Sequence, residues 1–89
     1  MIHRSSVIDK KAKIGKKVKI GPFCYVGPKV QIGDDVELIS NVHVEGNTKI
    51  GNNVKIGGGS GVINDIPDNQ QVMGYPAVPL KEFVKQRKK

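Results

Sequence analysis

Tryptophan is absent from this sequence of 89 residues, and aromatic side chains make up only 4% of it. Proteins that bind single-stranded nucleic acid without sequence preference stack the bases on aromatic rings, so this scarcity argues against that class. The sequence also contains no helix-turn-helix or zinc-finger pattern. We therefore expect no nucleic-acid partner.

Cysteine is nearly absent as well, because Cys24 is the single thiol of the chain. One cysteine cannot form an intrachain disulfide, and with His3 and His43 it offers too few ligands for a zinc site. We expect neither a metal nor a cofactor. A chain this short without such a staple has a thin core, and oligomerisation often supplies the missing burial.

Long apolar runs are also missing. The N-terminal stretch MIHRSSVIDK lacks the apolar segment of a signal peptide. No other stretch approaches the roughly 20 apolar residues that a helix needs to span a membrane. We expect a soluble, cytoplasmic protein with no transmembrane segment.

Charge is plentiful and mostly positive, with 15 lysines and arginines against 8 acidic residues and a formal net charge of +7. The lysines cluster in KKAKIGKKVK, residues 10–19, and in the tail KEFVKQRKK, residues 81–89. A solvated, lysine-rich surface explains this pattern, and an anionic partner is the alternative.

The strongest feature of the sequence is a repeat of six residues. An aliphatic side chain recurs at every sixth position, and a small or medium side chain follows each of the first ten after four residues. Cys24 is one of these small positions, which predicts a buried structural thiol. The aliphatic positions are Ile2, Ile8, Ile14, Ile20, Val26, Ile32, Leu38, Val44, Ile50, Ile56 and Val62.

A period of six fits neither an α-helix nor a simple amphipathic strand. It fits a short strand followed by a turn, stacked in coils whose backbones pair at the roughly 4.8 Å spacing of neighbouring strands. This is the hexapeptide-repeat pattern of β-helices. We predict a β-helix over residues 1–66, followed over residues 67–89 by an extended exit segment and a short basic helix. Leu80, Phe83 and Val84 share one face of that helix, which we expect to cover the last coil.

Two parts of the chain carry a family resemblance. Residues 2–51 resemble the opening coils of UDP-N-acetylglucosamine O-acyltransferase, most closely in GPFCYVGPKVQIGDD. From Lys55 onward, KIGGGSGVINDIPDNQQVMGYPAVPLKEF resembles the C-terminal part of UDP-3-O-acylglucosamine N-acyltransferase. The chain is thus similar to a strongly shortened hexapeptide-repeat acyltransferase of lipid A biosynthesis. This resemblance implies an all-β fold, a left-handed parallel β-helix of three to four coils with a short C-terminal helix, assembled as a homotrimer.

The resemblance also bears on the catalytic base. In the resembled enzymes a histidine of the middle coils takes the proton of the attacking acceptor, within a motif that reads approximately Asn-Ala-His-Ile-Ala-His-Asp-Cys. Residues 41–48, NVHVEGNT, occupy that frame, and the base position falls on Gly46, which has no side chain. His43 is the remaining catalytic candidate, with Glu45 or Asn41 to orient it. It follows the inward Val42, so we expect it to face outward.

The tail supplies a second candidate site. In the resembled enzymes a basic surface receives the acidic acyl carrier protein, which makes Lys81, Lys85, Arg87 and Lys88 candidates for that contact. A solubilising terminus is the alternative, and the sequence slightly favours it.

Three functions follow from these features. A trimeric β-helix scaffold without the catalytic middle coils is favoured, because the expected base position is Gly46. The first alternative is an active acyltransferase that moves a 3-hydroxyacyl group from acyl carrier protein to a UDP-glucosamine derivative. The second is a small coenzyme A-dependent acetyltransferase, suggested by the motif GYPA at residues 74–77.

Overall fold

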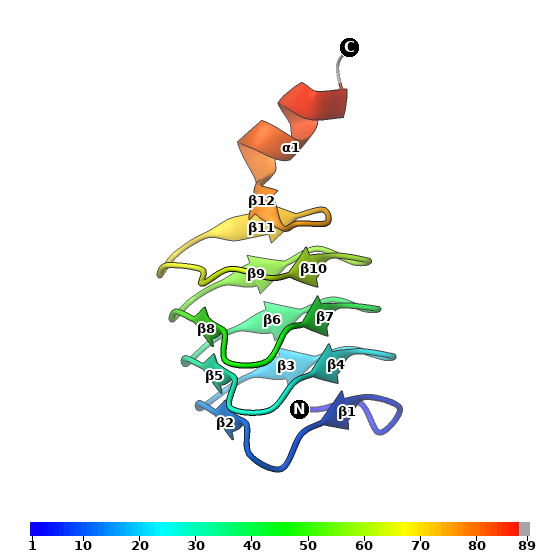
Figure 1. Ribbon diagram of the computed structural model, residues 1–89, viewed down its shortest axis with the longest axis vertical. Helices are drawn as coiled ribbons and strands as arrows, with labels where there is room; N and C mark the ends of the chain where they lie inside the picture. The colour runs from blue at the N-terminus through cyan, green and yellow to red at the C-terminus, as the bar shows by residue number, and fades with distance from the viewer. Residues whose placement is uncertain (88–89) are drawn as a thin grey trace.

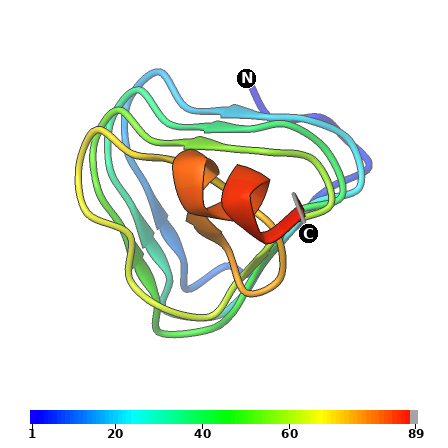
Figure 2. The ribbon, with the colours of Figure 1, turned by 90° about the horizontal axis from the view of Figure 1, so that it is seen from above.

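The chain winds into a triangular prism of stacked coils, as the computed structural model of residues 1–87 shows (Figure 1). Three short strands complete each coil, and about four left-handed coils follow one another, which confirms the predicted fold (Figures 1 and 2). The strands are β1 (Val7–Ile8), β2 (Lys13–Ile14), β3 (Lys19–Ile20), β4 (Tyr25–Val26), β5 (Gln31–Ile32), β6 (Glu37–Leu38), β7 (His43–Val44), β8 (Lys49–Ile50), β9 (Lys55–Ile56), β10 (Gly61–Val62), β11 (Gln71–Met73) and β12 (Val78–Pro79), followed by the helix α1 (Leu80–Arg87).

Parallel sheets form the three sides of the prism, in the orders β1-β4-β7-β10, β2-β5-β8 and β3-β6-β9-β11. The repeat sets their register, because each residue pairs with the residue three hexads later, as Tyr25 does with His43. The last coil continues past residue 66, since β11 pairs in parallel with β9. Its turn between Val62 and Ile66 is two residues shorter than in the other coils, so Gln71 pairs with Lys55.

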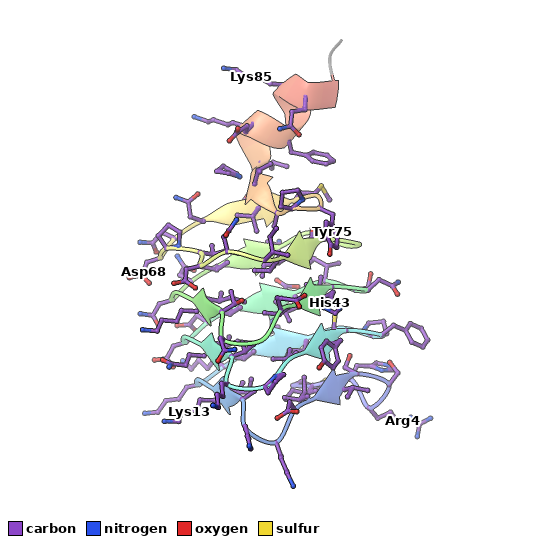
Figure 3. All side chains as sticks on the ribbon, in the orientation of Figure 1. Arg4, Lys13, His43, Asp68, Tyr75 and Lys85 are labelled. Carbon is purple, nitrogen blue, oxygen red and sulfur yellow. The ribbon has the colours of Figure 1, made fainter. Side chains whose placement is uncertain are left out.

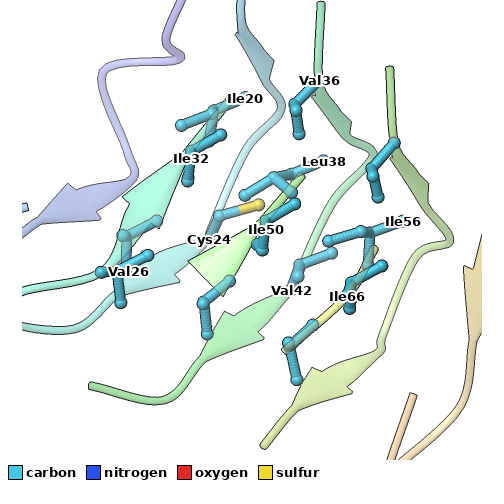
Figure 4. Close-up of a cluster of buried hydrophobic side chains, with 14 of the residues drawn as sticks. Ile20, Cys24, Val26, Ile32, Val36, Leu38, Val42, Ile50, Ile56 and Ile66 are labelled. Carbon is cyan, nitrogen blue, oxygen red and sulfur yellow. The ribbon is translucent and has the colours of Figure 1, made fainter. Parts of the chain in front are cut away.

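The core is a stack of aliphatic side chains along the axis of the prism (Figure 4). Side chains alternate between the two faces of a strand, so the aliphatic position of each hexad points inward while the residue before it points to solvent. Val26, Val44 and Ile56 are completely buried. Cys24 lies within this stack as a buried free thiol, as predicted.

The corners of the prism explain the turn-forming residues of the repeat. From Lys17 onward the second residue of the regular turns adopts a left-handed conformation, as at Asp35 (φ 58°) and Asn53 (φ 57°), which aspartate and asparagine tolerate well. Side chains at one corner also link successive coils. The Oδ1 atom of Asp34 accepts a hydrogen bond from the Lys16 N–H, and Asn52 Oδ1 accepts one from the Asp34 N–H, both at 2.8 Å. These bonds satisfy backbone donors that have no partner in the sheets.

The C-terminal end of the prism is closed. The strand β12 pairs antiparallel with β11 and so covers the outer edge of that sheet. Helix α1 follows and lies over the end of the prism (Figure 2). The Phe83 ring packs on Gly74, but Leu80 and Val84 remain 40% and 42% exposed. The prediction that all three would cover the last coil was therefore wrong for two of them, because the turn with Ala77 already occupies that place.

Candidate functional site

His43 lies on the outer surface of the sheet β1-β4-β7-β10, here called the His43 face. Its neighbours Val42 and Val44 point into the core and are buried, whereas the His43 side chain is 47% exposed. The prediction that His43 faces outward is confirmed. The face is formed by the outward positions of the four strands, which are Val7, Tyr25, His43 and Gly61.

A carboxylate holds one side of the imidazole. Glu45 points to the same side of the chain as His43, and its Oε2 atom lies 3.0 Å from His43 Nε2. When Nε2–H donates to this carboxylate, Nδ1 keeps its lone pair and can accept a proton. Of the two orienting residues suggested by the sequence, the structure therefore selects Glu45. Asn41 lies in a corner (φ 52°), where its N–H donates to the Pro22 carbonyl.

Aromatic rings flank His43 along the prism. The Tyr25 ring lies one coil below, with its centroid 5.0 Å from that of the imidazole and an angle of 32° between the ring planes. One coil above, the Tyr75 ring covers Gly61, where a Cβ atom would overlap it. Figure 3 shows His43 and Tyr75 on the same side of the prism. The site is thus a histidine–glutamate pair between two tyrosines.

Sequence reasoning had not identified either tyrosine. Tyr25 could have been found, because it precedes His43 by three hexads and therefore pairs with it. Tyr75 carries no such signal, since it lies in the turn between β11 and β12, beyond the regular repeat. Gly46, the expected base position, lies in a corner next to Pro28 and contributes only backbone there.

The basic tail forms a separate surface. Lys81 and Lys85 are exposed on α1 and line a shallow groove of about 760 Å³, together with the apolar Pro79, Leu80 and Val84. Arg87 ends the helix backbone, and Lys88 lies outside the described residues.

His3 takes no part in the His43 face. It lies in the first coil, where its N–H donates to the Ile20 carbonyl and its Nδ1 atom lies 2.8 Å from Ser5 Oγ. Residues 1–87 contain no group of three or more histidine, cysteine or acidic side chains arranged to hold a metal. Within the same residues, no helix has the length and apolar character needed to cross a bilayer.

Known proteins share this architecture. The structure resembles serine acetyltransferase from Neisseria gonorrhoeae, with a TM-score of 0.68 and 26% identity over 85% of the chain, and it spans only 40% of that protein. It also resembles a hexapeptide-repeat acetyltransferase from Vibrio cholerae O1 biovar eltor, determined with acetyl coenzyme A, with a TM-score of 0.59 and 22% identity. That match covers 90% of this chain and 68% of the Vibrio protein. No curated protein gives a significant match.

A family model matches the repeat itself. The description of that model is bacterial transferase hexapeptide (six repeats), and the matched residues are 11–38 and 29–64. Together these matches cover more than half of the chain, and they coincide with the coils between β2 and β10. The chain therefore belongs to the bacterial hexapeptide-repeat transferase family.

Proposed function

We propose that this chain is an acyltransferase that works as a homotrimer, with His43 as the general base. The observation that supports this proposal is the 3.0 Å contact between His43 Nε2 and Glu45 Oε2 on an exposed face. A histidine held by a carboxylate at one ring nitrogen presents the other nitrogen as a base and is stabilised once protonated. The scaffold interpretation rested on the missing side chain at Gly46, and His43 offers a base at another position.

The proposed reaction is attack by a hydroxyl or amine on an acyl thioester. The Nδ1 atom of His43 removes the proton from the acceptor while the acceptor's hydroxyl oxygen or amine nitrogen bonds to the thioester carbonyl carbon. The resulting tetrahedral intermediate collapses, the carbon–sulfur bond breaks, and the leaving thiolate takes the proton back from the imidazolium. Glu45 positions the ring throughout and balances its transient positive charge.

The openness of the site supports the proposed trimer. Side chains on and next to the His43 face are largely exposed in a single chain, with Val7 at 60% and Tyr75 at 70%. Apolar and aromatic side chains that gather on an exposed face are typical of an interaction surface. A neighbouring prism packed at this face would bury them and enclose a substrate, in keeping with the active sites between prisms of the resembled enzymes.

The family resemblance supports a 3-hydroxyacyl donor on acyl carrier protein and a UDP-glucosamine acceptor. Lys81 and Lys85 would then contact the acidic carrier protein, since both are exposed and line one groove. Acetyl coenzyme A is the second candidate donor. The likeness to serine acetyltransferase, at 26% identity, favours it.

The deciding experiment measures acyl transfer by the purified chain. Both donors are offered with UDP-N-acetylglucosamine and with UDP-3-O-acylglucosamine, and wild type is compared with His43→Ala. We expect His43→Ala to lower kcat by roughly a hundredfold or more. His3→Ala is the matched control and should retain full activity.

Two results would contradict the proposed function or assembly. Light scattering first establishes whether the protein is a folded trimer. If such a trimer transfers no acyl group from either donor above the His43→Ala background, then the scaffold interpretation is correct. A stable monomer would contradict the proposed assembly.

A further inference from the structure

The positive charge of the chain is concentrated in its first coil. Residues 1–20 contain seven basic side chains and a single acidic one, Asp9. The next coil, residues 21–38, reverses this balance, with three acidic side chains and only Lys29. All seven basic side chains of the first coil are exposed: Arg4, Lys10, Lys11, Lys13, Lys16, Lys17 and Lys19.

These cations surround the end of the prism. Turns of the first coil place Arg4 at one corner of the triangle, Lys10 and Lys11 at the second, and Lys16 and Lys17 at the third. Figure 3 shows Arg4 and Lys13 on opposite sides of this end. The ion pairs within residues 1–87 join Glu45 to His43 and Glu37 to Lys55, so none of these cations is neutralised by a carboxylate.

The centre of the same end is apolar. Ile2, Ile8 and Ile14 are the inward positions of the first coil, and no other coil within residues 1–87 packs below them. Ile2 is 44% exposed, and Ile8 and Ile14 are only partly buried. The C-terminal end differs, because β12 pairs with the outer edge of β11 and α1 continues beyond it (Figure 1). The first coil therefore presents apolar side chains within a ring of cations, here called the basic end.

We propose that the basic end docks on the surface of an anionic lipid bilayer. Lysines and arginines near such a surface are attracted to its acidic headgroups, and apolar side chains gain free energy by entering the interfacial region. An anionic bilayer can therefore bind both the ring of cations and the apolar centre of the basic end. The prism would stand on the membrane with its 41 Å long axis pointing away from it.

Two other occupants fit less well. A nucleic acid would match the charge, but its phosphate backbone would make no apolar contact with the exposed Ile2, and residues 1–20 contain no phenylalanine, tyrosine or tryptophan to stack with a base. A second copy docked end to end would match the apolar centre, yet it would bring two rings of lysines together and repel them. This proposal does not depend on the acyltransferase function.

Vesicle co-sedimentation tests the proposal with the full chain. Phosphatidylcholine vesicles are compared with vesicles that also contain phosphatidylglycerol, at low and at physiological salt. We expect binding only to the anionic vesicles, weakened by salt. Changing Lys10, Lys11, Lys16 and Lys17 to glutamate should weaken it by roughly a hundredfold or more.

The matched control changes Lys29, Lys49, Lys81 and Lys85 to glutamate, which gives the same net charge but leaves the basic end intact. It should bind anionic vesicles within a fewfold of wild type, and circular dichroism confirms that both variants are folded. Ile2→Ser, at an exposed position, should also weaken binding. The proposal is wrong if wild type does not bind, if it binds both vesicles equally, or if both four-lysine variants lose binding to the same extent.

Discussion

Tyr25 and His43 occupy the same position on successive coils, and their ring centroids lie 5.0 Å apart. This neighbourhood follows from the register of the repeat, because residues separated by three hexads stack along the same face. The His43 ring is therefore supported from below by an aromatic ring, and Glu45 contacts it from the side at 3.0 Å. Both contacts arise on a rigid parallel sheet, which is a good platform for a catalytic side chain.

Removing the Tyr25 ring should lower stability. We expect Tyr25→Ala to reduce the free energy of unfolding by at least about 1 kcal/mol, because a ring pair contributes about that much beyond the area it buries. Tyr25→Phe keeps the ring and should stay within about 0.5 kcal/mol of wild type. Urea unfolding measures both. A loss in Tyr25→Phe equal to that in Tyr25→Ala would show that the hydroxyl, rather than the ring, makes the contribution.

Glu45 should affect the rate rather than the affinity. If His43 is the base, Glu45→Gln removes the negative charge that stabilises its protonated form, and we expect kcat to fall by roughly tenfold or more with KM nearly unchanged. Acyl-transfer kinetics with the active donor provide the measurement. Glu37→Gln, on another sheet, is the matched control. An unchanged kcat in Glu45→Gln would exclude the positioning role.

The period of six predicted most of the fold. Two inward positions in each hexad were enough to identify the buried side chains, including Cys24 and Val44, and the outward direction of His43. Alternation along a strand is a local rule, so it can be read from the sequence. The same period also implies that Tyr25 and His43 are neighbours, because three hexads separate them.

The end of the chain could not be predicted in the same way. The shortened turn between Val62 and Ile66 breaks the period of six. The reversal of the chain into β12 depends on antiparallel pairing that lies outside the repeat. The position of Tyr75 over Gly61 and the exposure of Leu80 follow from that reversal. Tertiary packing, rather than local propensity, determines these features.

The Cys24 thiol should be protected from reagents. It is 2% exposed, and its Sγ atom lies 3.8 Å from the Pro22 carbonyl oxygen inside the prism. Modification requires the coil to open, so we expect an aromatic disulfide reagent to react at least roughly a hundredfold more slowly than in urea. Rapid reaction in native buffer would mean that the second coil opens readily.

Gly21 should tolerate no side chain. A Cβ atom at this position would overlap the Ile39 carbonyl oxygen of the next coil, and the adjacent Leu38 carbonyl and Ile39 N–H are both held by ladder hydrogen bonds. We expect Gly21→Ala to cost more than about 3 kcal/mol. Gly58→Ala is the matched control, because its Cβ would lie 3.3 Å from the mobile Ser40 hydroxyl, and its cost should stay below about 1 kcal/mol. Thermal unfolding distinguishes the two, and equal losses would contradict this steric explanation.

Leu38 and Ile39 offer the sharpest test of the core. These neighbours on the chain are 1% and 37% exposed, so the same truncation removes core contacts at one position and mainly surface area at the other. We expect Leu38→Ala to reduce the free energy of unfolding by about 2–5 kcal/mol and Ile39→Ala by less than about 1 kcal/mol. Urea unfolding measures both. Each coil contributes one layer of side chains to the core, so neighbouring layers can fill the cavity at Leu38 only by moving a whole coil, which the ladder hydrogen bonds resist. Equal losses at the two positions would instead show that stability resides in the outer faces and their contacts with other chains.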